Sequence, residues 1–300
     1  MTALTVIILT KDESLHITRA IASVQAIATQ IIVVDSGSSD DTVMLARDAG
    51  ATVLHHPWIN YATQFNWALQ HISDAPGWVL RLDADEVVSP ELAAQISAGL
   101  PEVNGIYVRR SMCFMGQPVR WGGVFPIQVL RLFRTGAGHC ENRWMDEHIV
   151  VTGPKAALSG MIIDDNHKSL DWWVAKHNAY ASREVVDILN RTHRFMPQEN
   201  IGGLRGRQQA AVKRWIKDQI YARLPGGLRA GLYFFYRYIL RLGFLDGRQA
   251  RAFHVLQGFW YRYLVDAKLA EIRRHMAISG DDPKAAILAV LGIDLGAGAS

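Results

Sequence analysis

The chain has 300 residues and a net charge of +4, and 49% of its residues are hydrophobic. This composition is typical of a globular protein with a sizeable core. Its two cysteines, Cys113 and Cys140, are too few for a disulfide framework and lack metal-site spacing, so a reducing cytosolic compartment is expected. Residues 191–275 carry 17 Lys and Arg against 5 Asp and Glu, a net charge of +12, whereas the remaining residues are acidic overall. This asymmetry indicates an anionic partner for the basic segment.

The first hundred residues alternate between strand and helix patterns. Continuous apolar runs predict strands at residues 4–10, 31–35, 51–55 and 78–83. Helices are expected after the first three at about residues 14–25, up to 48, and 61–71, with another beginning at Pro90. This alternation predicts an α/β fold with a mostly parallel sheet and helices on both faces. The N-terminus enters the first strand without a basic leader, so no signal peptide is expected.

The second half of the chain changes from strands to helices. Strand-like pieces are expected at residues 105–110, 127–133 and 161–164, separated by loops that contain Gly and Pro. Helical patterns follow at residues 171–190, 208–223, 227–243 and 247–276. We therefore expect a catalytic domain over residues 1–190 and a basic amphipathic helical region over residues 191–300.

A polar cluster follows three of the early strands, at residues 10–13, 35–38 and 83–86. Ligands of open α/β sheets bind outside the carboxyl ends of the strands, so these clusters are expected to converge on one crevice. Asp83 and Asp85 stand two positions apart in a segment expected to be extended. Their side chains would then point the same way and together face one Mg²⁺ or Mn²⁺ ion. No Gly-x-Gly-x-x-Gly or Walker-type loop follows the first strand to hold phosphate instead.

The three clusters also carry a family resemblance. Thr-x-Asp-Glu at residues 10–13, Ile-Ile-Val-Val-Asp-Ser-Gly-Ser-Ser-Asp-Asp-Thr at 31–42 and Leu-Asp-Ala-Asp-Glu at 82–86 resemble the family 2 glycosyltransferases with the GT-A (Rossmann-like) fold. Bacterial lipopolysaccharide-core and exopolysaccharide sugar transferases are the most similar subgroup. The resemblance spans about residues 4–190 and departs at Asp12, where the family more often has Asn.

The resemblance assigns roles within the binding site. It implies that Glu13 and Asp35 contact the base and ribose of a nucleotide-diphosphate sugar, with Thr10 in the same site. Asp83 would lie near the ribose and the metal, and Asp85 would ligate the metal directly. The family favours a uridine nucleotide.

Transfer by a single displacement needs a group that takes the proton from the acceptor hydroxyl. By resemblance this base is Glu147, with the adjacent Asp146 as the other candidate, and one displacement inverts the anomeric centre. The expected function is therefore inverting, metal-dependent transfer of a hexose to a lipopolysaccharide-core or lipid-linked saccharide acceptor. The alternatives are a sugar-nucleotide nucleotidyltransferase and a non-catalytic membrane-surface binding protein of the same fold.

The C-terminal region is expected to meet an anionic membrane surface. Arg229, Arg237 and Arg241 recur along one helical stripe beside many aromatic residues, and the charge-free runs are too short to span a bilayer. Such helices lie in the headgroup plane, which predicts a peripheral protein on the cytoplasmic face of the membrane, with no nucleic-acid partner. Packing on the catalytic domain is the alternative.

Three other residues are expected to have structural or contact roles. Arg131 is expected to be solvated or to meet diphosphate. His167 and His177 are expected to pack within a helix.

Overall fold

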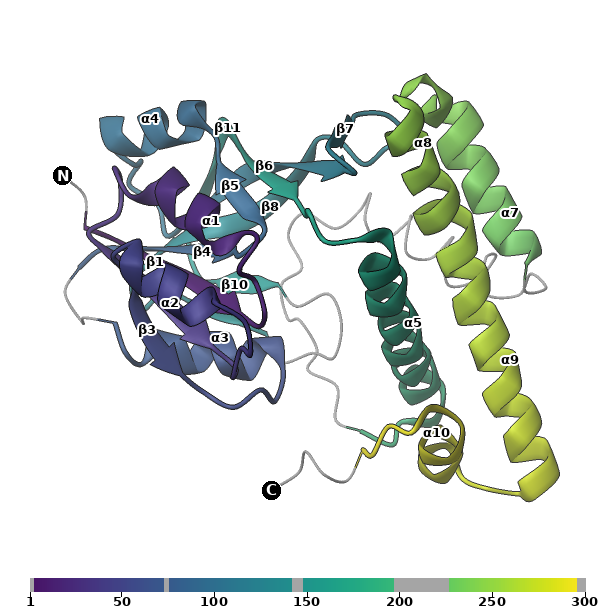
Figure 1. The fold of residues 1–300 in the computed structure, drawn as a ribbon. Coiled ribbons are helices and arrows are strands. Elements are labelled where there is room, and N and C mark those ends of the chain that lie inside the picture. Colours follow the sequence, from purple (N-terminus) through teal and green to yellow (C-terminus); the bar gives the residue numbers. More distant parts are fainter. Residues whose placement is uncertain (1–2, 73–75, 142–147, 197–226, 296–300) are drawn as a thin grey trace. The chain divides into compact units, whose positions relative to one another are not determined.

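The computed structural model describes residues 3–72, 76–141, 148–196 and 227–295 (Figure 1). The chain forms two compact units. The sheet unit holds the described residues up to Ser169 together with Asp246–Ala250, and the helical unit holds the other described residues. The division falls after Ser169, ahead of the expected boundary at residue 190, because helix α5 (Leu170–His193) packs against helix α9 (Tyr261–Ser279).

Four parallel strands form the first half of the sheet, in the spatial order β3-β2-β1-β4. Their bounds are Leu4–Thr10 for β1, Gln30–Asp35 for β2, Thr52–His55 for β3 and Trp78–Asp83 for β4. The helices after the first three strands are α1 (Ile17–Val24), α2 (Thr42–Asp48) and α3 (Tyr61–Leu69). These elements confirm the alternation of strands and helices expected from the sequence, and the parallel order places the carboxyl ends of the four strands at one edge.

The second half of the sheet is mixed. Its strands are β5 (Glu86–Val88), β6 (Gly105–Phe114), β7 (Gln117–Val119), β8 (Ile127–Arg134) and β11 (Lys155–Asp165), with helix α4 (Pro90–Ala98) after β5. β8 lies antiparallel between β4 and β6, whereas β11 runs parallel to β6. Parallel pairing is therefore confined to the first half and to the β6–β11 pair. A separate ribbon joins β9 (Gly138–Cys140) to β10 (Ile149–Val151).

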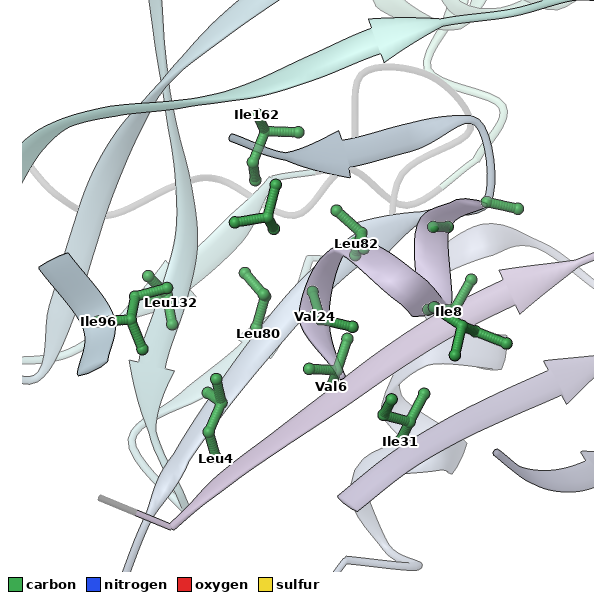
Figure 2. Close-up of a cluster of buried hydrophobic side chains, with 14 of the residues drawn as sticks. Leu4, Val6, Ile8, Val24, Ile31, Leu80, Leu82, Ile96, Leu132 and Ile162 are labelled. Carbon is green, nitrogen blue, oxygen red and sulfur yellow. The ribbon is translucent and has the colours of Figure 1, made fainter. Parts of the chain in front are cut away.

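Helices cover both faces of the sheet, as expected. On one face, Leu4, Val6 and Ile8 of β1 pack with side chains of α1, α2 and α4 (Figure 2). On the other face, Ile7 of the same strand packs with α3 and the β9–β10 ribbon. Alternate side chains of β1 therefore fill two cores, which is why this strand is a continuous apolar run in the sequence. Burying each such side chain contributes about 1.5–3 kcal/mol, so these cores fix the strand ends that carry the polar clusters.

The helical unit is built around α5 and α9, which pack with α10 (Pro283–Leu291). Helix α7 (Leu228–Phe235) continues into a π-helical turn at Tyr236–Leu240, and a 3-10 turn follows at Gly243–Leu245. Helix α8 (Arg248–Val255) continues through a second π-helical turn, Leu256–Trp260, into α9.

These helices confirm three of the four expected in this region. The fourth, expected at residues 208–223, lies outside the described residues, and α10 was not expected. Across the described part of the chain, every helix is too short or too polar to cross a membrane.

The expected arginine stripe is not a solvent-facing row. Arg229 forms an ion pair with Asp266, and the side chain of Arg237 lies against Tyr233, Phe253 and His254. Arg237 is only 4% exposed. Of the three arginines of the stripe, Arg241 alone is exposed. The expectation is wrong for Arg229 and Arg237 because α7 and its π-helical turn pack their charged side, and not their apolar side, against the rest of the unit.

Candidate functional site

The three polar clusters lie at one edge of the sheet. In the register of the parallel strands, Thr10 of β1 is paired with Asp35 of β2, and Leu9 of β1 is paired with Asp83 of β4. Neighbouring strands of a sheet are about 4.8 Å apart, so the ends of β2, β1 and β4 form one continuous floor. The convergence expected from the sequence is therefore present, and the roles of the individual residues stay predictions.

Asp35 shapes the loop that follows β2. Its Oδ2 accepts hydrogen bonds from the backbone N–H groups of Gly37, at 2.8 Å, and Ser38, at 2.9 Å. Its Oδ1 accepts from the Ser38 hydroxyl and, at 3.4 Å, from the Thr10 hydroxyl. The side chain is 1% exposed, and Gly37 has a φ of +89°, a conformation that glycine adopts without strain. Asp35 and Thr10 therefore fix the loop at this edge of the sheet, and a ligand bound there would meet that loop.

Glu13 is held by groups that lie far apart in the sequence. Its Oε1 accepts from Lys168 Nζ at 2.8 Å, and its Oε2 is 2.6 Å from Nδ1 of His16. The backbone N–H of His167 donates to the other ring nitrogen of His16 at 2.8 Å. His16 therefore carries its proton on Nδ1 and donates it to Glu13. This network ties the segment after β11 to the segment after β1.

Asp83 is held by a hydroxyl and a guanidinium. The Tyr61 hydroxyl donates to Oδ1 at 2.7 Å, and Arg131 Nη2 donates to Oδ2 at 3.0 Å. Arg81 Nε donates to the same Tyr61 hydroxyl at 2.8 Å. Burial alone would raise the pKa of Asp83, but the charges of Arg131 and Arg81 hold it well below its usual range. Asp83 is therefore a firmly ionised carboxylate whose two oxygens already have donors.

Asp85 has different surroundings, because β4 ends at Asp83 and residues 84–85 form a turn into β5. The expected extended backbone is therefore wrong at residues 84–85, where the strand gives way to a turn. Asp85 Oδ2 accepts from Asn166 Nδ2 at 2.9 Å, and the Asp85 carbonyl accepts from the N–H of Asp165 at 3.0 Å. Within the described ranges, Oδ1 of Asp85 has no hydrogen-bond or ion-pair partner.

The oxygen atoms available here suit a hard cation that also binds a ligand. Among the described residues, no three His, Cys, Asp or Glu side chains meet as a metal-binding group. Asp85, a half-buried residue, nevertheless offers a carboxylate beside the amide of Asn166. Mg²⁺ is commonly held by one or two carboxylates plus substrate phosphates and water. The residues present therefore fit an ion held jointly by Asp85 and a diphosphate.

A buried charge network lies beneath the turn at residues 84–85. Glu86 is fully buried and accepts from Arg131 Nη2 at 2.6 Å, and Arg110 Nε lies 3.3 Å away. Glu86 Oε2 also accepts from the backbone N–H of Asp83 at 3.0 Å, and Arg110 forms an ion pair with Asp164. Arg131 is 4% exposed, so the expectation that it is solvated is wrong: one guanidinium group bridges Asp83 and Glu86. The network holds both sides of the turn that presents Asp85.

The candidate bases Glu147 and Asp146 lie outside the described residues. The structure does describe both flanks of their segment. Cys140 exchanges two backbone hydrogen bonds with the side chain of Asn66, each 2.8 Å long. The backbone N–H of His148 donates to Glu141 Oε1 at 3.1 Å. The flanking residues are therefore anchored on α3 and within the β9–β10 ribbon.

Sequence reasoning missed the segment after β11. Asn166, His167 and Lys168 reach Asp85, His16 and Glu13 respectively, so this segment is part of the site. His167 lies before α5 and contacts Arg19 and Asp165, so the expectation of helix packing is wrong for it. His177, by contrast, stacks on Trp173 within α5, as expected. The polar run that starts at Asp164, at the carboxyl end of this strand, is the signal that could have found the segment.

Comparisons with known proteins bear on the family of this chain. A model of the family described as Glycosyl transferase family 2 matches residues 5–136. A glycosyltransferase of Rickettsia prowazekii is 44% identical over 97 residues, which cover 32% of this chain and only 32% of that relative's length. Among solved structures, glucosyl-3-phosphoglycerate synthase from Mycobacterium tuberculosis, in complex with Mn²⁺, uridine diphosphate and glucosyl-3-phosphoglycerate, has 22% sequence identity. That likeness covers 36% of this chain and 44% of the synthase, with a TM-score of 0.30.

A longer match reaches beyond the family model. The lipopolysaccharide core biosynthesis glycosyltransferase LpsC of Rhizobium meliloti is 30% identical over 189 residues, which cover 60% of this chain and 69% of LpsC. The motifs at the strand ends and this match lead to one assignment: the chain belongs to glycosyltransferase family 2.

Proposed function

We propose that the protein transfers a hexose from a nucleotide-diphosphate sugar to a lipopolysaccharide-core or lipid-linked saccharide acceptor, and that transfer depends on Mg²⁺ or Mn²⁺. The observation that carries the proposal is the turn between β4 and β5. It lies at the carboxyl edge of the parallel strands and presents one oxygen of Asp85 without a partner among the described residues. The similarity to LpsC supports an acceptor of the lipopolysaccharide-core class.

The donor would be bound at the edge formed by β1, β2 and β4. Asp85 would hold the cation together with the diphosphate, and a cation there would neutralise charge on the leaving nucleotide. The loop fixed by Asp35 and Thr10 would receive the nucleoside, for which the family favours uridine. Glu13 would stabilise this edge of the sheet through its contacts with His16 and Lys168.

The base would take the proton of the acceptor hydroxyl. We assign this role to Glu147, with Asp146 as the second candidate. A single displacement inverts the anomeric centre, so an α-linked donor would give a β-linked product. Cys140 and His148, which flank these two candidates in the sequence, are themselves anchored within the sheet unit.

The proposal includes a place of action on the cytoplasmic face of the membrane. A lipid-linked or lipopolysaccharide-core acceptor is anchored in a bilayer, so the enzyme must work at its surface. The basic composition of residues 191–275 supports an anionic surface as the partner.

A ligand-stabilisation screen tests the donor site. Nucleoside diphosphates and nucleotide-sugars are added with Mn²⁺ or with EDTA, and the melting temperature is measured. A ligand at 100 times its dissociation constant stabilises the fold by about 2.7 kcal/mol, so the true donor is expected to raise the melting temperature only with the metal. No stabilisation by any nucleotide would contradict the proposal. Release of pyrophosphate from a nucleoside triphosphate and a sugar phosphate would instead identify a nucleotidyltransferase.

A further inference from the structure

Helix α7 and its π-helical turn place charged and apolar side chains on the opposite sides from an ordinary surface helix. Their two charged residues face inward: Arg229 pairs with Asp266, and Arg237 is buried. The outward positions are apolar or aromatic and are 41–62% exposed: Leu228, Leu232, Phe235, Tyr236, Ile239 and Leu240. A helix that meets water normally shows the opposite pattern, with charged residues outside. This inversion indicates that the outer face meets a non-aqueous environment.

The apolar surface continues onto neighbouring elements of the helical unit. Phe234 of α7 lies 6.2 Å from Phe259, ring centroid to centroid, and Phe259 lies 6.0 Å from Tyr263. The outer apolar surface is the set formed by the residues above and by Leu242, Phe244, Leu245, Val255, Phe259 and Tyr263, each 38–52% exposed. Monomeric soluble proteins rarely expose large apolar patches, and such patches often mark interaction sites.

Arginines outnumber carboxylates in the sequence around this surface. Residues 227–265 contain six arginines, and their one acidic residue is Asp246. Asp246 is itself buried and accepts hydrogen bonds from the backbone N–H groups of Arg120 and Trp121 in the sheet unit. Arg241 and Arg251 are exposed. An apolar centre with exposed arginines and without exposed carboxylates matches acyl chains below anionic headgroups.

We propose that the outer apolar surface inserts into the acyl region of an anionic bilayer and that insertion, more than surface charge, holds the protein to the membrane. This inference rests on the proposed function only for its choice of a bilayer as partner. The exposed aromatic residues Phe235, Tyr236, Phe259 and Tyr263 suit the boundary between headgroups and acyl chains. A second copy of the chain would cover the surface without lipid, and the tests below separate it from a bilayer.

The first test measures binding of the full chain to vesicles of phosphatidylethanolamine and phosphatidylglycerol. The outer variant carries Leu232→Ser, Phe235→Ser and Ile239→Ser. The control variant carries Met44→Ser, Ile278→Ser and Leu288→Ser, which change side chains that are 50–75% exposed elsewhere. We expect the outer variant to bind vesicles at least about tenfold more weakly than the wild type, and the control variant to bind like the wild type.

Salt separates insertion from surface charge. At about 1 M salt the screening length falls to about 3 Å, which removes attraction between exposed charges and headgroups but not burial of apolar groups. We expect wild-type binding to persist in high salt. Complete release of the wild type at high salt would overturn the insertion proposal and would leave charge as the attachment.

A fluorescent label tests the depth of insertion. Phe235→Cys in a Cys113→Ser background is labelled with an environment-sensitive dye, while Cys140 is buried and stays unlabelled. Vesicles are expected to shift its emission to the blue, and a label at Ile278→Cys is expected to keep its emission. An unchanged spectrum at position 235 would overturn the proposal.

Two further outcomes would also overturn the insertion proposal. The first is equal vesicle binding by the outer variant and the wild type. A wild-type dimer that becomes monomeric in the outer variant, without vesicle binding by either, would assign the surface to a second copy. Hydrolysis of a soluble donor is measured in parallel, so failure of vesicle binding and failure of the proposed transfer reaction are seen separately.

Discussion

Asp83 and Asp85 carry the same side chain two positions apart, yet their contacts suit different tasks. Asp83 accepts hydrogen bonds from Tyr61 and Arg131 on its two oxygens, so its charge is already balanced within the protein. Asp85 accepts a side-chain hydrogen bond from Asn166 on one oxygen. A hard cation needs carboxylate oxygens that are open to it. Within the proposed mechanism, Asp85 is therefore the ligand and Asp83 holds the end of the strand.

Removing the ligand charge should abolish metal-linked binding and spare the fold. For Asp85→Asn we expect the affinity for a nucleoside diphosphate in Mn²⁺ to fall by more than about 100-fold, because even outer-shell changes cost 10–100-fold. Titration calorimetry measures it. The matched control Asp48→Asn makes the same chemical change at an exposed position of α2 and should bind normally. Normal binding by Asp85→Asn would contradict the assignment of the metal.

Loss of the base should slow the transfer step more than it weakens donor binding. Glu147→Gln is nearly isosteric and cannot accept a proton, so we expect kcat to fall by on the order of 10²–10⁴-fold with donor affinity within a few-fold. Steady-state kinetics with a saccharide acceptor measure both quantities. If Asp146→Asn has the large effect and Glu147→Gln a mild one, the base is the neighbouring residue.

The buried network should make stability depend on pH. Burial raises the pKa of Glu86 to about 7 from an ordinary 4.5, although Arg131 opposes this. Between those values the folded state keeps a proton that the unfolded state has lost, so this group's contribution to the free energy of unfolding falls as pH rises.

Glu86→Gln removes this titration and keeps the shape of the side chain. From about pH 5 to pH 7, we expect the wild type to lose on the order of 2 kcal/mol of stability relative to Glu86→Gln. Urea denaturation at each pH gives the difference, which cancels the other titrating groups. Parallel pH profiles for the two proteins would show that Glu86 is ionised throughout.

At the scale of elements, a bulge in β11 lets helix α4 pack closely on the sheet. The register between β11 and β6 shifts between Ala157 and Met161, and Gly160 lies within this shift. The hydroxyl oxygen of Ser89, the N-cap of α4, accepts from the N–H of Leu92 and also from the N–H of Met161. One serine therefore caps the helix and ties it to the bulge.

This packing predicts opposite effects for two glycine substitutions. A Cβ atom at Gly160 would lie 2.5 Å from Cα of Leu92, so Gly160→Ala should destabilise the protein by about 1–3 kcal/mol. Gly231, within α7, has nothing within 4 Å of an added Cβ, so Gly231→Ala should stabilise its helix by roughly 0.5–1 kcal/mol. Urea denaturation followed by circular dichroism measures both. A neutral Gly160→Ala would contradict the close approach of α4.

At the scale of the whole molecule, the sequence predicts what is local and misses what is long-range. The strands β1 and β4 and the N-cap at Ser89 follow from apolar runs and capping chemistry, which neighbouring residues determine. The contacts of Lys168 with Glu13 and of Asn166 with Asp85 join residues far apart in the chain, so no local pattern contains them. The buried state of Arg131 and Arg237 was missed for the same reason, because composition alone makes an arginine look solvated.

The two units divide the proposed function between them. The proposed donor site lies within the sheet unit, and the outer apolar surface lies within the helical unit. Membrane attachment raises the local concentration of a membrane-anchored acceptor but not that of a dissolved donor. Changes to the outer apolar surface should therefore slow transfer to a membrane-anchored acceptor and leave use of the donor unchanged.

Transfer to two kinds of acceptor tests this division. We expect the outer variant to transfer sugar to a vesicle-embedded glycolipid at least about tenfold more slowly than the wild type. Its transfer to a water-soluble saccharide fragment and its hydrolysis of the donor should stay within about twofold of the wild type, because surface substitutions rarely perturb a distant fold. The control variant should match the wild type with both acceptors. Equal losses with the soluble and the embedded acceptor would mean that the surface supports the catalytic site itself, since attachment to a bilayer cannot change a reaction that occurs in solution.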